Sequence, residues 1–297
     1  MIKKAVIPAA GFGTRLLPAT KSQPKEMLPI VDKPTIQYVV EEAVASGITD
    51  ILMIIGKGKR SIEEHFDRNF ELEAALAEKG KDELLQEIRH ITELADIHFV
   101  WQKELNGLGD AIRYARHHVG QEPFAVLLGD SILASKAQLP ITKQLMEIYD
   151  RYQAPVVALE AVDPKFVYRY GVIGGKEIDK RIYRVEEFVE KPPVEEAPSN
   201  LVIAGRYVFT AEIFEYLDKV GRGKNNEVQL TDAMANMLKQ KAMYALHFDG
   251  ERFDVGNKLD FIKTNLRFGL ERPEMKEDLK KWINELNTQL QAEEVYP

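Results

Sequence analysis

Short apolar segments alternate with helical patterns through the first 130 residues, and this alternation limits the chain to few folds. The apolar segments, "KKAVIPAAG", "DILMIIG", "IHFVWQ" and "FAVLLGD", each end in a glycine or a polar residue. Between the first two lie five apolar residues with the spacing of one helix face: Ile36, Val39, Val40, Ala43 and Val44. Alternating strands and helices are typical of a parallel sheet covered by helices on both faces. We therefore expect an α/β fold with a Rossmann-like, doubly wound sheet.

The second half of the chain is less regular and predicts further strands. Strand patterns occupy four segments, 154–162, 170–175, 181–192 and 200–209, and helical patterns occupy 211–220 and 231–241. We expect this half to extend the same sheet, making it mixed, and to add a small antiparallel lobe over the site.

In the first half, Ser61 and Glu64 have the spacing of a capping box, which predicts a helix that starts there.

The C-terminal segment predicts an amphipathic helix. Beyond Pro273, apolar residues recur at helical spacing: Leu279, Trp282, Ile283, Leu286 and Leu290. We expect this helix either to strap its own domain or to form a contact between two copies of the chain.

Composition excludes several classes of protein. A formal net charge of -7 and a pI of about 5.6 are of the wrong sign for a nucleic-acid binder or a polybasic membrane contact. The absence of cysteine excludes disulfides, thiolate catalysis and thiolate metal sites. No run of 18 apolar residues occurs, and Pro8 and Gly11 interrupt the apolar run at the N-terminus. We expect a soluble cytoplasmic protein without nucleic-acid or membrane partners.

Glycines and polar residues follow the ends of the predicted strands. Gly11–Gly13, Gln102, Gly107–Gly109 and Asp130 all lie just beyond apolar segments. Ligands bind at the carboxyl ends of strands in such sheets, so these residues predict one site. Leu16 stands where a dinucleotide fingerprint needs its third glycine, and no Walker A motif is present.

Cations accompany the first glycine pair. The loop after Gly13 contains Arg15, Lys21 and Lys25, and no acid precedes Glu26. Backbone N–H groups and cations placed after a strand suit a polyphosphate.

The wider loop resembles a known family. "AAGFGTRLLPATKSQPKEMLPIVDKP" is similar to the motif of the sugar-phosphate nucleotidyltransferases, and "KEMLP" resembles their bacterial uridylyltransferase branch. The thymidylyltransferase branch usually has glutamine in place of Glu26. The resemblance continues through "QKELNGLGDA", "FAVLLGD", "YGVI", "FVEKP", "AGRYVF", "EVQLTDA" and "FDVGNK", and it covers about residues 2–270.

This resemblance implies an activity and a domain organisation. The implied enzyme is a UTP–glucose-1-phosphate uridylyltransferase, which converts UTP and α-D-glucose 1-phosphate to UDP-glucose and pyrophosphate with Mg²⁺. Its product serves carbohydrate metabolism and the cell envelope. The implied domain covers 1–270, with a nucleotide-binding part at about 1–135 and a sugar-binding part at about 136–270, followed by a helical extension at 271–297. Relatives form dimers or tetramers, so we expect a homodimer, with a tetramer as the alternative.

The resemblance also implies the role of each candidate residue. It implies two catalytic cations, Arg15 and Lys25, and two magnesium ligands, Asp130 and Asp254. The implied nucleotide-binding residues are Ala10, Gly11, Gly13, Thr14, Glu26, Gln102 and Gly107. The implied sugar- and phosphate-binding residues are Gly171, Glu190, Lys191, Ala204 and Gly205. The Gln102 amide fits the N3–H and O4 edge of uracil, and thymine presents the same edge.

Two positions depart from the family pattern. Ser131 follows Asp130 where relatives commonly have a second aspartate, and Asp110 stands where relatives often have histidine. Ser131 leaves open what role the family's second aspartate would have here. Asp110 leaves small substrate preferences open.

Three alternatives remain at this point. One is the same scaffold acting on dTTP or on another hexose 1-phosphate. The second is an NAD-dependent oxidoreductase, which Leu16 disfavours. The third is a sugar-nucleotide sensor that has kept the pocket and lost turnover.

Overall fold

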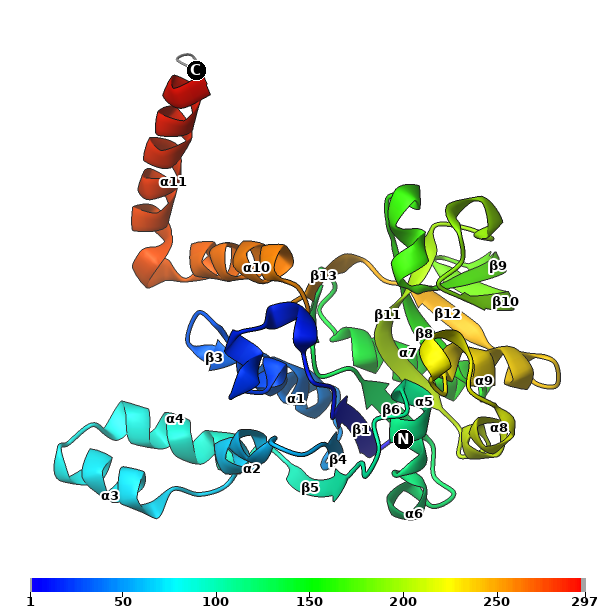
Figure 1. Cartoon of the computed structure of the whole chain (residues 1–297). Coiled ribbons are helices and arrows are strands. Elements are labelled where there is room, and N and C mark those ends of the chain that lie inside the picture. The colour runs from blue at the N-terminus through cyan, green and yellow to red at the C-terminus, as the bar shows by residue number, and fades with distance from the viewer. Residues whose placement is uncertain (1, 295–297) are drawn as a thin grey trace.

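A large mixed sheet forms the centre of the protein (Figure 1). The computed structural model describes residues 2–294, and residues 295–297 of the predicted extension lie outside the described residues. Within the described residues this sheet has nine strands in the order β5-β4-β1-β6-β11-β8-β12-β10-β9. Their bounds in chain order are β1 Lys4–Ala9, β4 Asp50–Ile55, β5 Asp96–Trp101, β6 Phe124–Leu127, β8 Val156–Ala161, β9 Gly171–Asp179, β10 Ile182–Glu190, β11 Leu201–Phe209 and β12 Tyr244–His247.

The first four strands of the chain that enter this sheet are mutually parallel, as the alternating pattern predicts. β1 pairs with β4 and β6, and β4 pairs with β5. β11 then runs antiparallel to both β6 and β8, which makes the sheet mixed. The predicted antiparallel lobe is the hairpin β9–β10, which continues the far edge of the same sheet. The expected fold class is therefore confirmed.

Helices cover both faces of the sheet because its buried strands are apolar on both sides. Along β1, Ala5 and Ile7 pack into one core cluster, whereas Val6 packs into the other. The first cluster lies under helices α1 Thr35–Ala45, α2 Arg60–Phe66, α4 Asp82–Thr92 and α7 Ile141–Tyr152. The second lies under helices α5 Leu108–Arg113, α6 Arg116–Val119, α8 Ile213–Lys219 and α9 Leu230–Leu238.

Helix α2 forms where the sequence predicts a helix, but its cap differs. The helix begins at Arg60 with Lys59 as the N-cap residue and without a side-chain cap bond. Ser61 is therefore inside the helix, and the capping-box prediction is wrong. The Ser61 hydroxyl is buried without a hydrogen-bond partner among the described residues, so it caps no N–H group, and the Lys59 side chain beside it is buried in an ion pair with Glu26.

Two small antiparallel pairs and two C-terminal helices complete the fold. β7 Ser131–Ser135 pairs with β13 Gly250–Asp254, and β2 Pro29–Ile30 pairs with β3 Lys33–Pro34. α10 Lys258–Glu271 packs on this region through Phe268, whose ring makes edge contacts with Tyr38 and Phe253.

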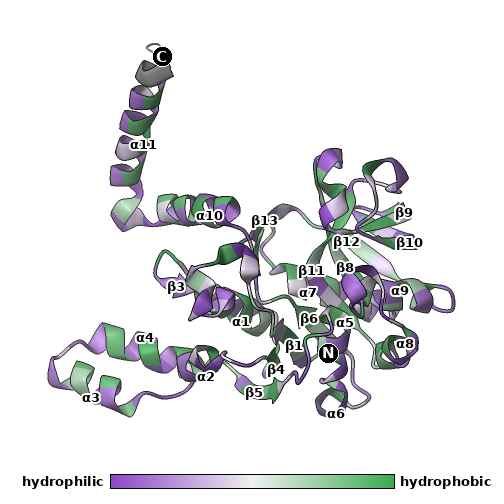
Figure 2. Cartoon of the chain, in the orientation of Figure 1, coloured by the Kyte–Doolittle hydropathy of each residue, from purple (hydrophilic) through white to green (hydrophobic). Residues whose placement is uncertain are grey.

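Helix α11, Pro273–Glu294, packs against α10 and extends away from the rest of the protein (Figure 1). Leu279 of α11 packs closely against Gly269 of α10. A Cβ added to Gly269 would lie 2.8 Å from a methyl carbon of the Leu279 side chain. Apolar and polar residues alternate along α11 (Figure 2). The predicted helix is therefore present, and it does not strap its own domain.

Helix α3, Phe70–Glu78, forms a second projection together with α4 (Figure 1). None of the helices described between residues 2 and 294 has the length and apolar character needed to cross a membrane.

A buried arginine ties the strands near the sheet centre to the helices. Arg206 on β11 is fully buried, and its guanidinium contacts Glu42 of α1 at 2.8 Å. The same guanidinium donates to the carbonyls of Leu128 and Ser131, on either side of Asp130. The other oxygen of Glu42 accepts from the Thr142 hydroxyl on α7 at 2.6 Å. This network fixes the backbone of the segment that contains Asp130.

We predict that Arg206→Met lowers the free energy of unfolding by about 3 to 5 kcal/mol, because it leaves the Glu42 carboxylate buried without its cation. Chemical denaturation measures this loss. The matched control is Arg151→Met, which breaks a solvent-exposed pair with Asp179 and should leave the free energy of unfolding close to that of the wild type. Similar losses in the two variants would contradict this assignment.

Candidate active site

The carboxyl ends of four parallel strands form one edge, where the predicted site residues gather. The loops after β5, β4, β1 and β6 follow one another in that order along the edge. They approach closely: a Cβ on Gly56 would lie 2.8 Å from the carbonyl oxygen of Ala10. Gln102, which follows β5, donates its backbone N–H to Ile55 at 2.8 Å. Ala10, Gln102 and Asp130 are thus held at neighbouring points.

Glycines shape the loop after β1. Gly13 has φ +67°, and its carbonyl accepts from the Thr20 hydroxyl at 2.8 Å. A Cβ on Gly13 would lie 3.1 Å from the Cβ of Lys25, so this glycine lets the loop fold back. A Cβ on Gly11 would meet no atom within 4 Å, so the backbone there faces open space. Thr14 and Arg15 follow in a short 3₁₀ turn, Thr14–Leu16.

Lys25 and Asp130 form the central contact of the site. The Lys25 Nζ lies 2.5 Å from Asp130 Oδ2 and 3.9 Å from Glu26 Oε1. Burial lowers the pKa of Lys25, but the carboxylates of Asp130 and Glu26 outweigh burial and raise that pKa above its ordinary value. Burial raises the pKa of Asp130, but Lys25 and Arg15 outweigh it and hold that pKa below its ordinary value. Both side chains are therefore charged at neutral pH.

Arg15 and Asp254 both lie beside Gly256, and the Arg15 charge also acts on Asp130. A Cβ on Gly256 would lie 2.7 Å from an Arg15 guanidinium nitrogen and 2.9 Å from Asp254 Oδ1, so both side chains border the same glycine. The β7–β13 pairing sets Asp254 opposite Ser131, and Val255 donates its N–H to the Asp130 carbonyl at 3.3 Å. Two carboxylates and two cations from distant parts of the chain therefore converge at one place.

Glu26 is buried and paired, which the sequence does not reveal. Its Oε2 lies 2.8 Å from the Nζ of Lys59, and both side chains are almost inaccessible. Burial raises the pKa of Glu26 although Lys25 and Lys59 oppose it. Glu26 therefore positions the loop, and its pair with Lys59 joins that loop to the turn after β4.

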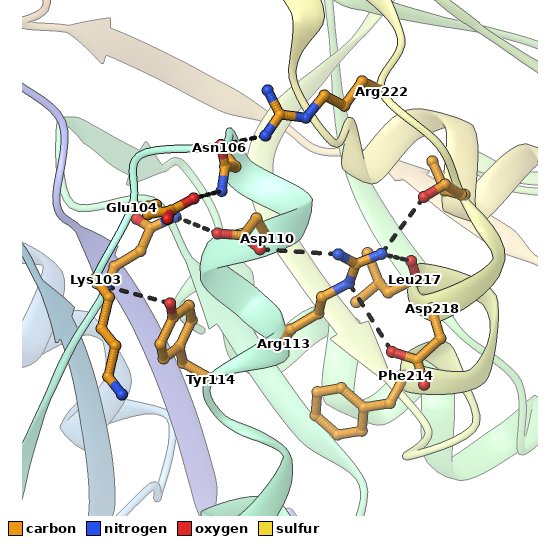
Figure 3. Close-up of polar contacts among 12 residues, drawn as sticks. Lys103, Glu104, Asn106, Asp110, Arg113, Tyr114, Phe214, Leu217, Asp218 and Arg222 are labelled. Atoms are coloured by element: carbon orange, nitrogen blue, oxygen red, sulfur yellow. Dashed lines mark hydrogen bonds and ion pairs between the residues drawn. The ribbon is translucent and has the colours of Figure 1, made fainter.

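The loop after β5 is held by polar contacts with α5 (Figure 3). The Gln102 amide Nε2 donates to Asp110 Oδ2 at 2.9 Å, and the backbone N–H of Lys103 donates to the Tyr114 hydroxyl at 3.2 Å. Gly107 has φ +101°, and a Cβ there would lie 2.7 Å from the Glu227 Cβ. The glycine at this position is thus explained by packing of the two loops, and its predicted contact with the nucleotide stays a prediction.

The predicted sugar-side residues lie together on neighbouring strands. Glu190, at the end of β10, accepts from the Thr231 hydroxyl at 2.7 Å and pairs with Lys191 at 2.7 Å. Gly171, at the start of β9, is opposite Glu190, and a Cβ there would lie 3.0 Å from the Thr231 hydroxyl oxygen.

Ala204 and Gly205 lie in β11, where its register shifts. Gly205 has φ +79°, and its carbonyl accepts from Leu128 N–H at 3.0 Å, beside the segment that holds Asp130. The Ala204 methyl group is fully buried in the core, which leaves its backbone for any contact with a ligand.

Three site-supporting residues were missed in the sequence: Lys59, Thr231 and Arg206. The available signals are a lysine four residues beyond the end of an apolar strand, for Lys59, and an arginine within an apolar strand, for Arg206. Both resemble ordinary surface residues until the structure shows them buried.

Comparison with known proteins places this arrangement in a family. The family model described as nucleotidyl transferase matches residues 4–269. A UTP–glucose-1-phosphate uridylyltransferase of Staphylococcus haemolyticus (strain JCSC1435) is 54% identical over 285 residues, which cover 96% of this chain and 98% of that protein.

Two solved structures have the same fold. The structure titled UTP-bound UGPase from Acinetobacter baumannii has a TM-score of 0.89 at 42% identity and covers 96% of this chain and all of that one. A UDP-glucose pyrophosphorylase complexed with UDP-glucose has a TM-score of 0.85 at 43% identity, covering 92% of this chain and all of that one. The match over nearly the whole chain, together with the site geometry, shows that this chain belongs to the nucleotidyl transferase family.

Proposed function

We propose that this chain is a UTP–glucose-1-phosphate uridylyltransferase, which converts UTP and α-D-glucose 1-phosphate to UDP-glucose and pyrophosphate. The observation that carries the proposal is the cluster of Lys25, Asp130, Arg15 and Asp254 at the strand ends. It is supported by a relative of that name over 96% of the chain and by similar structures whose titles name UTP and UDP-glucose.

The proposed reaction is an in-line displacement. A phosphate oxygen of glucose 1-phosphate attacks the α-phosphorus of UTP, and the bond from that phosphorus to the bridging oxygen breaks as pyrophosphate leaves. Both substrates are anions, so catalysis consists of positioning and electrostatic stabilisation. Lys25 neutralises charge at the reacting phosphoryl group, and Arg15 holds the triphosphate and the leaving pyrophosphate.

The acidic residues at the site fit a magnesium ion. Mg²⁺ is usually held by one or two carboxylates together with substrate phosphates and water. Asp130 and Asp254 provide two carboxylates on adjacent backbone segments, and no group of three metal-ligating side chains forms among the described residues. When bound, the ion would neutralise phosphate charge. Lys25 and Arg15 hold the pKa of Asp130 below its ordinary value, which keeps that carboxylate ionised, and the Gly256 N–H donates to Asp254 Oδ1 at 2.9 Å.

The substrates occupy two halves of the site in this proposal. The loop after β1, with Ala10, Gly11, Gly13 and Thr14, approaches the nucleotide, and Gln102 contacts the uracil edge. Glu190 accepts hydrogen bonds from sugar hydroxyls, and Lys191 contacts the sugar phosphate. The Thr231 hydroxyl donates to Glu190 and fixes the orientation of its carboxylate.

We predict Mg²⁺-dependent pyrophosphate release from UTP and glucose 1-phosphate, and a loss of about 100- to 1,000-fold in kcat for Lys25→Ala, because a charge-stabilising donor is removed. The assay includes dTTP, galactose 1-phosphate and N-acetylglucosamine 1-phosphate. The control is Lys79→Ala, at the exposed end of α3, which should retain wild-type turnover. Turnover only with another substrate pair would keep the reaction type and assign a different nucleotide or sugar specificity. Binding of UDP-glucose without turnover of any pair would favour the sugar-nucleotide sensor.

The C-terminal helix supports a homodimer as the proposed assembly. Trp282, Leu286 and Leu290 are 50%, 37% and 53% exposed on a helix that extends away from its own domain (Figure 1). An apolar stripe of this kind is typical of a helix that packs against a second copy.

We predict that the wild type sediments as a dimer or larger assembly, and that Trp282→Glu shifts it toward monomer because the charge would be buried at the contact. Sedimentation velocity measures the change. Lys281→Glu, on the neighbouring exposed position of the same helix, should leave the assembly intact. A monomeric wild type would rule out this assembly.

A further inference from the structure

The orientation of the Gln102 side chain is fixed by a single acidic partner. Gln102 is 7% exposed, and its amide Nε2 donates to Asp110 Oδ2 at 2.9 Å. A carboxylate can only accept hydrogen bonds, so it pairs with the NH₂ group of the amide and repels the amide oxygen. The nitrogen therefore lies on the Asp110 side, and the oxygen lies on the other.

Asp110 is itself held in place from the opposite side. Its Oδ1 faces Arg113 Nη1 at 3.8 Å, and the Arg113 guanidinium also donates to the carbonyl of Leu217 and, at 3.4 Å, to that of Val220 (Figure 3). The Lys103 N–H bonded to Tyr114 joins the same loop to α5. A chain of contacts thus runs from the end of α8 through Arg113 and Asp110 to the Gln102 amide.

The orientation of an amide decides which pyrimidine it matches. Uracil presents a donor at N3 beside a carbonyl acceptor at position 4, whereas cytosine presents an acceptor at N3 beside an amino donor. An amide that can turn over matches both bases equally well, because it exchanges its donor and acceptor. An amide fixed in one orientation matches only one of them.

We propose that Asp110 is a specificity-determining residue that makes the site select UTP over CTP by fixing the orientation of the Gln102 amide. This inference rests on the proposed function, in which Gln102 contacts the base. Asp110 acts as a positioning residue, because it touches the amide and not the nucleotide.

The test is Asp110→Asn, which preserves the shape of the side chain and removes its charge. The new side-chain oxygen keeps its place beside Arg113, which is a donor, and the new NH₂ group faces Gln102. That NH₂ group favours the reversed Gln102 amide. We expect the ratio of kcat/KM for UTP to that for CTP to fall by about 10- to 100-fold, with a gain for CTP.

The matched control is Asp218→Asn, which alters a carboxylate that contacts Arg113 and Arg116 without touching Gln102. It should keep the wild-type ratio. Calorimetric affinities for UDP and CDP compare the two bases without turnover. Base selectivity can therefore be measured even in a variant with impaired catalysis. Asp110→Ala, which removes the carboxylate, should lower the ratio in the same direction.

The inference would be overturned by an unchanged UTP-to-CTP ratio in a folded Asp110→Asn variant, or by an equal fall of that ratio in Asp218→Asn. A wild type that uses both nucleotides equally would also overturn it. A wild type that turns over neither nucleotide and does not bind UDP would instead refute the proposed function, which keeps the two failures distinct.

Discussion

The ion pair between Lys25 and Asp130 is the contact on which the site depends. Its atoms lie 2.5 Å apart, although the residues are 105 positions apart in the chain. The pair forms because parallel pairing of β1 with β6 puts the loops that follow them at the same edge. Each charge stabilises the other against burial, so the site holds a cation and an anion side by side at the position that we propose for the triphosphate and the metal ion.

Buried charges away from the ligand extend this arrangement. Glu26 and Lys59 join the loop after β1 to the turn after β4, and Arg206 with Glu42 fixes the backbone on both sides of Asp130. A buried charge that lost its partner would be costly, so these pairs limit how far the loops can move. They therefore help to hold Lys25 and Asp130 in place, as the proposed displacement between two anions requires.

The sequence was sufficient for the fold and for the edge of the sheet at which the candidate residues gather, because both follow from the hydrophobic period and the direction of parallel strands. It was insufficient for the supporting residues. Lys59 and Arg206 resemble surface cations in sequence, and their burial depends on Glu26 and Glu42, which are distant in the chain. The capping-box prediction at Ser61 was wrong because the helix already begins at Arg60, and the spacing of two residues in the sequence does not fix where a helix starts. The individual ligand contacts stay predictions.

A double-mutant cycle on Lys25 and Asp130 tests the central claim most directly. The kcat/KM for UTP would be measured for the wild type, Lys25→Met, Asp130→Asn and the double variant. If the two residues act as one unit, the double variant should lose little more than the more damaged single variant. Losses in free energy that simply add would contradict a coupled pair, and the site would then consist of two independent groups.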